Sequence, residues 1–416
     1  MDIKALEKKF QNCLCGKVHT CPIDFVSIGE GAIVDVSKAA ESFGNILLIS
    51  DENTYKAAGK RVEELLGEKL EKSIILKSQG KVVIPNEEKI QEIENALTEN
   101  TDFIIGVGSG VINDLCKHVS FKRGLYYGIV ATAPSMDGYA SVGSALILEG
   151  MKVTLNARPP KAIIGDSNVL KTAPLEMLKA GYGDIIGKFS CLNDWKLSAF
   201  LNGEHFCENI YNLTFDCVKS IENKGRAIIS RDTEAVGELF EALVLVGVAM
   251  SFTGSSRPAS GSEHHLSHFF EITGILDGSD YFAHGIDVAF SARKTAELRR
   301  DILSKTPSKR AFDRAFYEKE IKRIYKTSAD GVISLQNKLG WYEKKEDISC
   351  MWEGARDILL EVPTPEEFDS MLESVELSYS DFEELYGSKK IADSILYAKD
   401  LKDRYSVLWL YYEYFR

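Results

Sequence analysis

The sequence has no apolar run long enough to cross a membrane. The longest, about residues 242–250, is far short of the roughly 20 residues that a span requires. The first twelve residues are charged throughout, so we do not expect a signal peptide. Basic residues are in deficit, with 50 Lys and Arg against 62 Asp and Glu and a formal net charge of −12. This balance argues against a nucleic-acid partner and against a protein bound to an anionic membrane.

Cysteine is also scarce, with eight residues in 416, which is typical of a reduced protein, and we expect a cytoplasmic chain. A chain of this length favours two domains. The first half alternates short apolar runs with amphipathic stretches, a pattern that indicates βαβ units and a parallel sheet. An antiparallel hairpin is expected to turn near Glu149 and Gly150. The strands are expected at residues 25–28, 46–50, 73–77, 103–107, 126–132 and 161–166.

Beyond about residue 170 the pattern is almost only helical. We therefore expect an α/β domain over residues 1–170 and an all-α domain over residues 171–416. The stretch at 233–250 is largely apolar, which predicts a buried helix. The cleft between two such domains is a common ligand site.

A glycine cluster lies between an expected strand and an expected helix, in FIIGVGSGVINDL at 103–115. Gly106, Gly108 and Gly110 allow a sharp turn and the close approach of a ligand. The N–H groups at the helix start suit a phosphate or pyrophosphate. The spacing is not the standard GxGxxG, so a tight turn that holds no ligand is an equal alternative.

Two further features favour a ligand at this edge of the sheet. Asn113 and Asp114 stand in the first helical turn, as either capping groups or ligand contacts. A turn-rich loop, ATAPSMDGYAS at 131–141, follows the next strand. Both loops emerge at the carboxyl ends of parallel strands, where open α/β sheets bind nucleotides.

Histidine is concentrated in one region, because four of the seven fall within residues 264–284. His264 and His268 are one turn apart on one helix face, and His265 points away from that face. His284 follows at a second expected helix start. Imidazoles at this spacing predict a metal site, with chance clustering as the alternative.

A divalent metal usually takes a carboxylate beside two imidazoles. Asp184 offers one within an apolar helical stretch, flanked by Gly183 and Gly187. Burying an acid is costly unless it is paired or metal-bound, and the small neighbours allow close approach. Taken alone, Asp184 is equally a helix cap or an ion-pair partner.

Five segments occur in an order that is specific, although each alone is weak. They are DENTYKAAG at 51–59, GVGSGVIND at 106–114, TAPSMDGYAS at 132–141, GDIIGKFSCLNDWKLS at 183–198 and SGSEHHLSHFFE at 260–271. Together they resemble the glycerol-1-phosphate dehydrogenases, including the bacterial AraM-like group. That family belongs to the iron-containing alcohol dehydrogenase and dehydroquinate synthase superfamily.

The resemblance implies a mostly parallel Rossmann-like sheet followed by an all-α, dehydroquinate synthase-like domain, with NAD or NADP and one divalent metal (zinc, nickel or iron) in the cleft. The implied metal ligands are Asp184, His264 and His284. Asp137, Asp184 and His268 are the candidate catalytic and substrate contacts. The candidate coenzyme contacts are Asp51, Gly108, Ser109, Gly110, Val111, Ile112, Asn113, Asp114, Thr132, Ala133, Pro134, Ser135 and Ser141.

The activity that this family implies is reversible hydride transfer between NAD(P)H and dihydroxyacetone phosphate, giving sn-glycerol 1-phosphate. A Lewis-acid metal would stabilise the developing alkoxide, and His268 would supply the proton. Three alternatives stay open: a glycerol or polyol dehydrogenase, a lyase of the dehydroquinate synthase type, and a nucleotide-binding regulator without catalysis. The phosphate-binding residue is left unassigned among Lys188, Arg257 and Arg158.

Two parts of the chain depart from the family pattern. The last histidine continues as HGIDVAF at 284–290, where the family usually has HGxxVG, and nothing after about residue 300 can be matched. The family implies a homo-oligomer, a dimer or larger. The aromatic tail either covers an interface or completes the core; its members are Trp409, Tyr411, Tyr412, Tyr414 and Phe415.

The sequence leaves two residue roles open. Asp51 follows the second strand, where an acid can bind the ribose 2′-hydroxyl and favour NAD, but it is equally a helix cap. Near the N-terminus, Cys13, Cys15, His19 and Cys21 form a candidate zinc set. Their CxC spacing is not that of the usual zinc knuckle.

Overall fold

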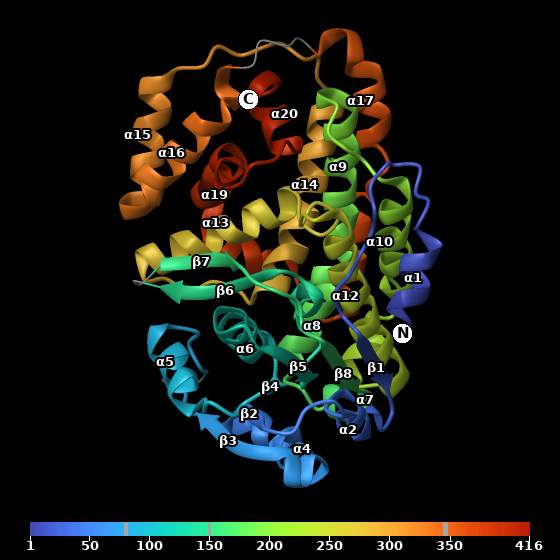
Figure 1. Cartoon of the computed structure of the whole chain (residues 1–416). Helices are drawn as coiled ribbons and strands as arrows, with labels where there is room; N and C mark the ends of the chain where they lie inside the picture. The colour runs from blue at the N-terminus through green and yellow to red at the C-terminus, as the bar shows by residue number, and fades with distance from the viewer. Residues whose placement is uncertain (79–81, 149–150, 344–347) are drawn as a thin grey trace. The chain divides into compact units, whose positions relative to one another are not determined.

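The computed structural model describes residues 1–78, 82–148, 151–343 and 348–416 (Figure 1). The chain packs into two compact units, and each is described by itself. The first unit comprises Met1–Tyr182 and Lys224–Ser255, and the second comprises Gly183–Asn223 and Ser256–Arg416. The division into functional domains at residue 170 stays a prediction.

A six-stranded, fully parallel sheet forms the centre of the first unit, in the order β1-β8-β5-β4-β2-β3. Each predicted strand is present, which confirms the α/β interpretation. The bounds are β1 Phe25–Gly29, β2 Ile46–Asp51, β3 Leu70–Leu76, β4 Phe103–Gly108, β5 Tyr126–Ala131 and β8 Ala162–Asp166.

The predicted hairpin is also present, as antiparallel strands β6 (Gly143–Leu148) and β7 (Met151–Asn156). The expected turn at Glu149 and Gly150 lies outside the described residues.

The central strands are continuously apolar because helices cover both faces of the sheet. On one face, Leu48 and Ile105 pack against α2 (Val36–Ala39) and α4 (Lys60–Leu66). On the other, α6 (Gly110–Arg123) lies along β4 and β5, beside α5 (Glu87–Ala96). Every residue of β4 is buried, as this sandwich requires.

The strand order reverses between β2 and β4. From β2 the chain adds β3 on one side and then crosses back to add β4 on the other. Ser50 pairs with Val107, and Gly108 pairs with Ala131, so the carboxyl ends of β2, β4 and β5 are neighbours. Open α/β sheets bind nucleotides at such a reversal.

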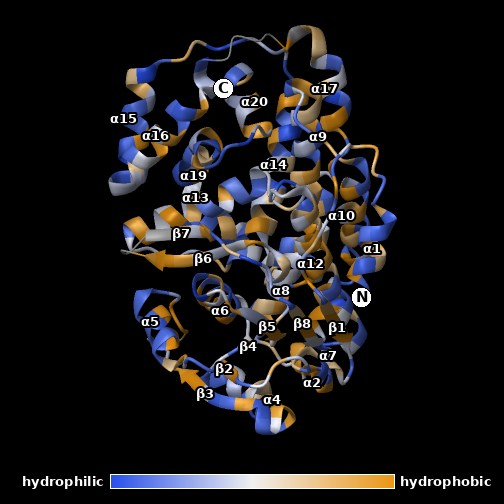
Figure 2. Cartoon of the chain, viewed as in Figure 1, coloured by the Kyte–Doolittle hydropathy of each residue, from blue (hydrophilic) through white to orange (hydrophobic). Residues whose placement is uncertain are grey.

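One long apolar helix, α12 (Thr233–Thr253), completes the first unit. Its length and composition would suffice to cross a membrane, but 78% of its most apolar window is buried. Figure 2 shows its mostly hydrophobic colouring. Gly247 lies against the short 3₁₀ helix η4 (Asp137–Ala140), where a Cβ would come 2.7 Å from that of Ala140. The helix therefore serves as a core element of this unit, as the sequence predicts.

All the regular elements in the described residues of the second unit are helices, as predicted. Helix α8 (Leu175–Ile186) begins in the first unit and ends in the second. The longer helices that follow in the second unit are α9 Lys188–Asn202, α10 Glu208–Ile221, α13 Ser262–Asp277, α14 His284–Leu303, α15 Arg314–Tyr325, α16 Ala329–Leu339, α17 Trp352–Leu359, α18 Pro365–Ser374, α19 Tyr379–Tyr397 and α20 Val407–Tyr414.

The aromatic tail completes the core of the second unit. Trp409, Tyr412, Tyr414 and Phe415 are each at most 5% exposed. Of the two roles that the sequence left open for the tail, the structure favours the core.

Candidate functional site: a dinucleotide edge and a metal centre

The glycine turn of the first unit joins β4 directly to α6. Ser109 is the residue before the helix, and its side chain makes no capping bond within the described part of the chain. The first N–H groups of a helix have no intrahelical acceptor, so those of Gly110, Val111 and Ile112 suit an anion. The start of α6 therefore has the features of a pyrophosphate site.

The glycines are required here by packing, because none of Gly106, Gly108 and Gly110 has a positive φ. A Cβ at Gly108 would meet Ile112 at 2.5 Å, and one at Gly106 would meet Cys116 Sγ at 2.9 Å. They allow the helix to lie close to its own strand, whereas the sequence analysis attributed them to a sharp turn.

Asn113 and Asp114 make structural bonds that neither sequence alternative included. The Asn113 Oδ1 accepts a hydrogen bond from the Tyr127 hydroxyl at 3.1 Å. The Asp114 Oδ2 accepts one from the Ala145 N–H at 3.1 Å, which attaches the β6–β7 hairpin to α6. Buried Lys117 donates to Gly138 O and Gly143 O, each at 2.8 Å. The two polar side chains thus support the loop, and a direct coenzyme contact by them stays a prediction.

The second predicted loop lies beside the glycine turn, because the Thr132 N–H donates to Gly108 O at 3.1 Å. Ala133 O accepts from the Tyr139 hydroxyl at 2.7 Å. Pro134 O is so close to α8 that a Cβ at Gly181 would come within 1.7 Å of it. The rest of this loop comprises Ser135 and Asp137, both half-buried, and Ser141, whose hydroxyl donates to Gly138 O at 3.0 Å.

Asp51 caps the next helix. Its Oδ1 accepts the N–H groups of Asn53 and Thr54, each at 2.8 Å. The capping alternative is therefore confirmed. Both bonds use the same oxygen, so the cap leaves the role of Oδ2 toward a ribose hydroxyl as a prediction.

The three predicted metal ligands converge within the second unit. Asp184 from α8, His264 from α13 and His284 from the start of α14 each present a ligand atom, and these atoms lie within 4.8 Å of one another. His264 Nε2 is 3.6 Å from Asp184 Oδ1. The ring centroids of His264 and His284 are 5.1 Å apart.

Neighbouring groups set the orientation and charge of these ligands. His264 Nδ1 is 2.6 Å from Glu263 Oε1, so the carboxylate accepts a hydrogen bond from Nδ1–H and Nε2 is directed at Asp184. Ser267 Oγ lies 3.4 Å from His284 Nδ1. Burial, with a further effect of the Lys188 charge, holds the pKa of His264 well below its usual value, so the imidazole is neutral. A neutral imidazole oriented by a carboxylate is the form that binds metals, and the donor set fits a divalent cation.

Glycines next to the ligands bring α8 and α14 together. A Cβ at Gly183 would lie 2.3 Å from Gly285 O, and one at Gly187 would lie 2.4 Å from Val288 Cγ1. Gly183 directly precedes the predicted ligand Asp184, and Gly285 directly follows the predicted ligand His284. The small residues around Asp184 therefore admit a helix backbone, and this contact places Asp184 beside His284.

Asp184 forms an ion pair with buried Lys188, which is one of the alternatives that the sequence left open, although the sequence did not identify the partner. Its Nζ lies 2.6 Å from Asp184 Oδ1 and donates to Ala259 O at 3.0 Å. The other two cations considered for a phosphate have internal partners as well: Arg257 binds Glu204 through two nitrogens, and Arg158 packs on the Tyr126 ring. The phosphate-binding group therefore stays unassigned.

Two more histidines occupy α13. His268 is half-buried, and its ring centroid lies 5.6 Å from that of His284, so it borders the metal ligands as expected. His265 is fully buried and is not a member of the ligand group, in agreement with the expected helix face.

The segment after His284, which departs from the family pattern, contains a buried acid that bonds to α19. Asp287 is 1% exposed, and both its carboxylate oxygens accept from the Tyr386 hydroxyl, at 2.8 and 2.9 Å. Burial raises the pKa of Asp287 well above its usual value. The acid in HGIDVAF thus joins α14 to α19.

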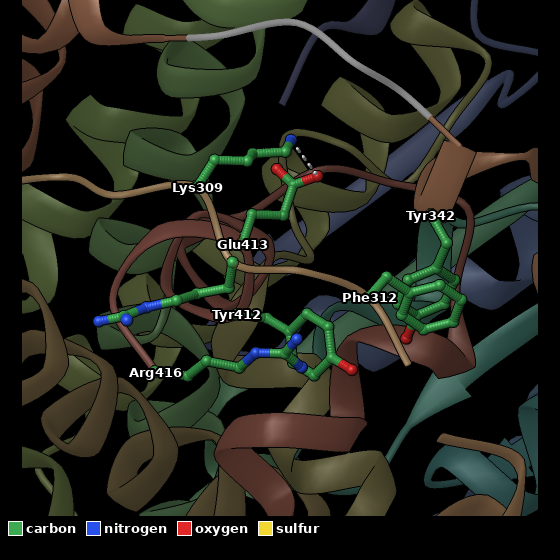
Figure 3. Close-up of a pocket in the computed structure, with 7 residues that line it drawn as sticks. Lys309, Phe312, Tyr342, Tyr412, Glu413 and Arg416 are labelled. Carbon is green, nitrogen blue, oxygen red and sulfur yellow. Dashed lines mark hydrogen bonds and ion pairs between the residues drawn. The ribbon is translucent and has the colours of Figure 1, made fainter. Parts of the chain in front are cut away.

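A small pocket elsewhere in the second unit contains none of the predicted site residues (Figure 3). Two of its three cations have partners in the described structure: Lys309 Nζ lies 3.3 Å from Glu413 Oε1, and the Arg416 guanidinium lies 3.7 Å from the Tyr412 ring centroid. The lining residues are Lys309, Arg310, Phe312, Tyr342, Tyr412, Glu413 and Arg416.

Comparison with known sequences connects both halves of this description to one group of enzymes. A family model described as iron-containing alcohol dehydrogenase matches residues 28–174. A protein of Halalkalibacterium halodurans named glycerol-1-phosphate dehydrogenase [NAD(P)+] is 32% identical over 305 residues, covering 72% of this chain and 76% of that protein. One of Bacillus licheniformis with the same name is 31% identical over 335 residues, covering 79% and 82%.

Solved structures share the fold at low identity. An alcohol dehydrogenase from Oenococcus oeni has a TM-score of 0.63 at 14% identity, covering 93% of this chain and 94% of its own. A probable glycerol dehydrogenase from Sinorhizobium meliloti has a TM-score of 0.53 at 19% identity, covering 84% and 98%. Coverage of 93% means that much of the chain after residue 300, which the sequence alone did not match, belongs to the shared fold.

Proposed function

This chain belongs to the iron-containing alcohol dehydrogenase family and is a dehydrogenase of that superfamily, and we propose that it interconverts dihydroxyacetone phosphate and sn-glycerol 1-phosphate with NAD or NADP and one divalent metal. The observation that carries the proposal is the convergence of Asp184, His264 and His284 from three helices. Relatives of about 30% identity that are named for this activity support the choice of substrate.

In the proposed mechanism Asp184, His264 and His284 hold the metal. When bound, the metal provides Lewis-acid stabilisation for the charge that develops on the carbonyl oxygen, and the nicotinamide provides the hydride. Glu263 fixes the tautomer of His264, and Lys188 fixes the rotamer of Asp184, so both act as positioning residues.

His268 is the proposed proton donor to the carbonyl oxygen during reduction, directly or through one water. It lies one helical turn from His264 and is half-buried, so it borders the ligands and still exchanges protons with solvent. An imidazole titrates near neutral pH, which suits a group that must donate in one direction and accept in the other. Asp137 is the further proposed substrate contact.

The proposed coenzyme site is the edge formed by the ends of β2, β4 and β5. The N–H groups of Gly110, Val111 and Ile112 would hold the pyrophosphate, and residues 132–135 with Ser141 would contact the nicotinamide half. Asp51 would use Oδ2 for the ribose 2′-hydroxyl, which favours NAD over NADP.

The experiment is a substrate panel on metal-loaded protein. Following NADH and then NADPH absorbance with dihydroxyacetone phosphate should show oxidation that depends on added zinc, nickel or iron(II). Asp184→Ala and His264→Ala should lose this turnover and retain NAD(P) binding. His205→Ala, an exposed histidine of the same unit, is the matched control and should keep wild-type activity. Near-full activity of either ligand variant in chelator would overturn the site assignment.

The same panel separates the competing substrate. Oxidation of unphosphorylated glycerol, with no turnover of the phosphate ester, would replace the proposal by a polyol dehydrogenase. A homodimer is a further proposal that rests on the family resemblance, and light scattering of the purified protein tests it. A cytoplasmic location is a proposal that rests on the charged N-terminus and the low cysteine content.

A further inference from the structure

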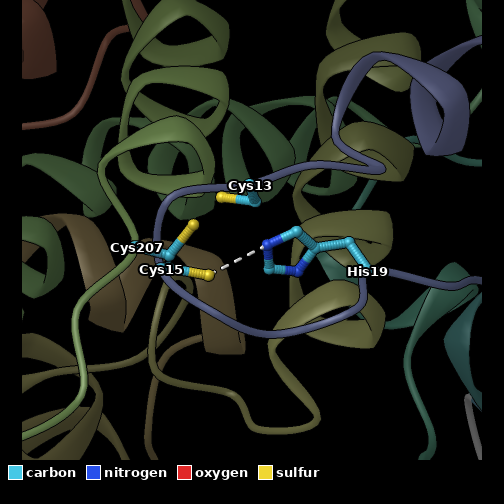
Figure 4. A group of neighbouring side chains, drawn as sticks. All are labelled: Cys13, Cys15, His19 and Cys207. Carbon is cyan, nitrogen blue, oxygen red and sulfur yellow. Dashed lines mark hydrogen bonds between the residues drawn. The ribbon is translucent and has the colours of Figure 1, made fainter.

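The loop that follows α1 (Ile3–Lys9) has an inverted pattern of exposure. Leu14 and Val18 are 102% and 77% exposed, although both are apolar. In the same loop His19 is 2% exposed, and Cys13 and Cys15 are half-buried. Within residues 13–19 no aliphatic side chain is therefore buried, and the side chains that face the protein are two thiols and one imidazole (Figure 4).

His19 is held in one orientation and one tautomer. Its Nδ1 lies 2.9 Å from Phe252 O, and because a carbonyl only accepts, Nδ1 carries the proton. The ring packs between Phe10 and Phe252, with centroids 6.3 and 5.9 Å away. Nε2 is then the nitrogen with a lone pair, and it points at Cys15 Sγ, 3.3 Å away. A histidine that donates one ring N–H to a backbone carbonyl is the usual arrangement of a metal-ligating imidazole.

The spacing of the three donors matches a tetrahedral metal. One ligand atom each from Cys13, Cys15 and His19 lies within 4.8 Å of the others. With Zn–S near 2.3 Å and Zn–N near 2.05 Å, tetrahedral geometry places sulfur and nitrogen about 3.6 Å apart and two sulfurs about 3.8 Å apart. The observed 3.3 Å needs an adjustment of only about 0.3 Å.

We propose that Cys13, Cys15 and His19 bind a structural zinc ion that is separate from the metal of the dehydrogenase site. Two thiolates with an imidazole select zinc over magnesium or calcium. Binding of Zn²⁺ releases the two thiol protons to solvent, forms two Zn–S bonds and one Zn–N bond, and involves no change in oxidation state.

Cys21, the fourth member of the set named from sequence, is not part of this group. Its N–H donates to Glu7 Oε1 at 2.8 Å, and burial raises the pKa of its thiol. The fourth coordination position belongs to a water or to another cysteine. Cys207, also drawn in Figure 4, belongs to the second compact unit, so a variant of its own decides its role.

The zinc would attach the N-terminal segment to α12. His19 already bonds to the carbonyl of Phe252, near the end of that helix, so two coordinated thiolates would fix residues 13–19 at the same place. This site is independent of the proposed function, because none of its residues belongs to the coenzyme edge or to the ligand group of Asp184.

The test is cobalt substitution of the full-length protein. A thiolate–Co²⁺ pair gives an intense ligand-to-metal charge-transfer absorption in the near ultraviolet. Asp184, His264 and His284 contain no sulfur, so this band reports the second site alone. We expect the band in wild type, together with two bound metals per chain after reconstitution with zinc.

Cys13→Ser and Cys15→Ser should each lose the band and one metal equivalent. Asp184→Ala should keep the band and lose the other equivalent. Cys21→Ser is the matched control and should retain both metals. Cys207→Ser should weaken the band or reduce the affinity for zinc at least tenfold only if Cys207 supplies the fourth ligand. One metal per chain and no sulfur band in reduced wild type would overturn the proposal, as would a disulfide between Cys13 and Cys15 in protein purified under reducing conditions. Wild-type spectra answer the question even if the variants fail to fold.

Discussion

Replacing Gly183 with alanine should disable the proposed metal centre without changing a ligand. The added Cβ would lie 2.3 Å from Gly285 O and 3.0 Å from Ala289 Cβ. Ordinary contact begins at 3.4 Å, so α8 and α14 must separate by about 1.1 Å at this point. The obstacle is a backbone carbonyl, so no side-chain rotation relieves the overlap. Asp184 and His284 are the next residues on the two helices, and they must separate with them.

The geometry gives the size of the expected effect. Metal–ligand distances tolerate about 0.2 Å, so a displacement near 1 Å should weaken metal binding at least tenfold. A misplacement of that size costs about 10²-fold in rate. Overpacking also lowers the free energy of unfolding by about 1–3 kcal/mol. Coenzyme binding should not change, because Gly183 lies outside the first unit.

The assay combines metal affinity by chelator competition, kcat/KM at saturating metal, and thermal unfolding. Gly331→Ala is the matched control, since nothing lies within 4 Å of its added Cβ on α16. That change should raise stability by about 0.5–1 kcal/mol and leave activity unchanged. Gly187→Ala should have an intermediate effect, because it meets only Val288 Cγ1 within 3 Å. If Gly183→Ala folds cooperatively and binds metal as tightly as wild type, the spacing of α8 and α14 does not determine the site.

Two further outcomes follow from buried charges. Lys188→Met removes the ammonium 2.6 Å from fully buried Asp184. In the presence of a chelator, this change should lower the free energy of unfolding by about 3–5 kcal/mol. Saturating zinc should recover part of that stability. Burial lowers the pKa of Lys399 from 10.5 to about 8, so between these values the unfolded chain binds a proton that the folded chain has lost. The free energy of unfolding of the wild type, relative to that of Lys399→Met, should therefore rise with pH across this window by at most about 1.4 kcal/mol per pH unit. Paired denaturation curves measure this difference. A difference that stays constant from pH 8 to 10 would refute the lowered pKa of Lys399.

The parallel sheet could be predicted because its signal is local and repeated. Each strand is a short apolar run between amphipathic stretches, and covering both faces of the sheet requires that composition. The candidate metal ligands came from two sources. The spacing of His264 and His268 indicated a metal site, and the acid in an apolar helix needed a partner. The ligand set with His284 in place of His268 came from the family resemblance, and the structure brings that set together.

The hydrogen bonds of Asn113 and Asp114 could not be predicted, because their partners are far away in the sequence. Asn113 bonds to Tyr127, and Asp114 bonds to the Ala145 N–H on the hairpin. Both residues were correctly expected at the start of a helix, yet their bonds are set by how the hairpin lies against α6. Glu263 had a sequence signal, since it directly precedes His264, but only the structure shows its oxygen 2.6 Å from Nδ1.

The glycines beside Asp184 could be identified from the sequence, but their role could be seen only in the structure. From sequence they indicated access for a ligand, and in the structure they admit the backbone of α14. Gly183 and Gly285 stand next to a ligand on each helix, so the point of closest helix approach is also the point where the two ligand side chains begin. Because the two backbones are close, short side chains are long enough to reach the same point. Short side chains have few rotamers, so their ligand atoms are held more tightly than those of longer side chains on separated helices. In the proposed metal centre, a small residue next to a ligand on each helix would hold the ligand atoms together, so an alanine, the smallest available change, should be enough to disrupt the site.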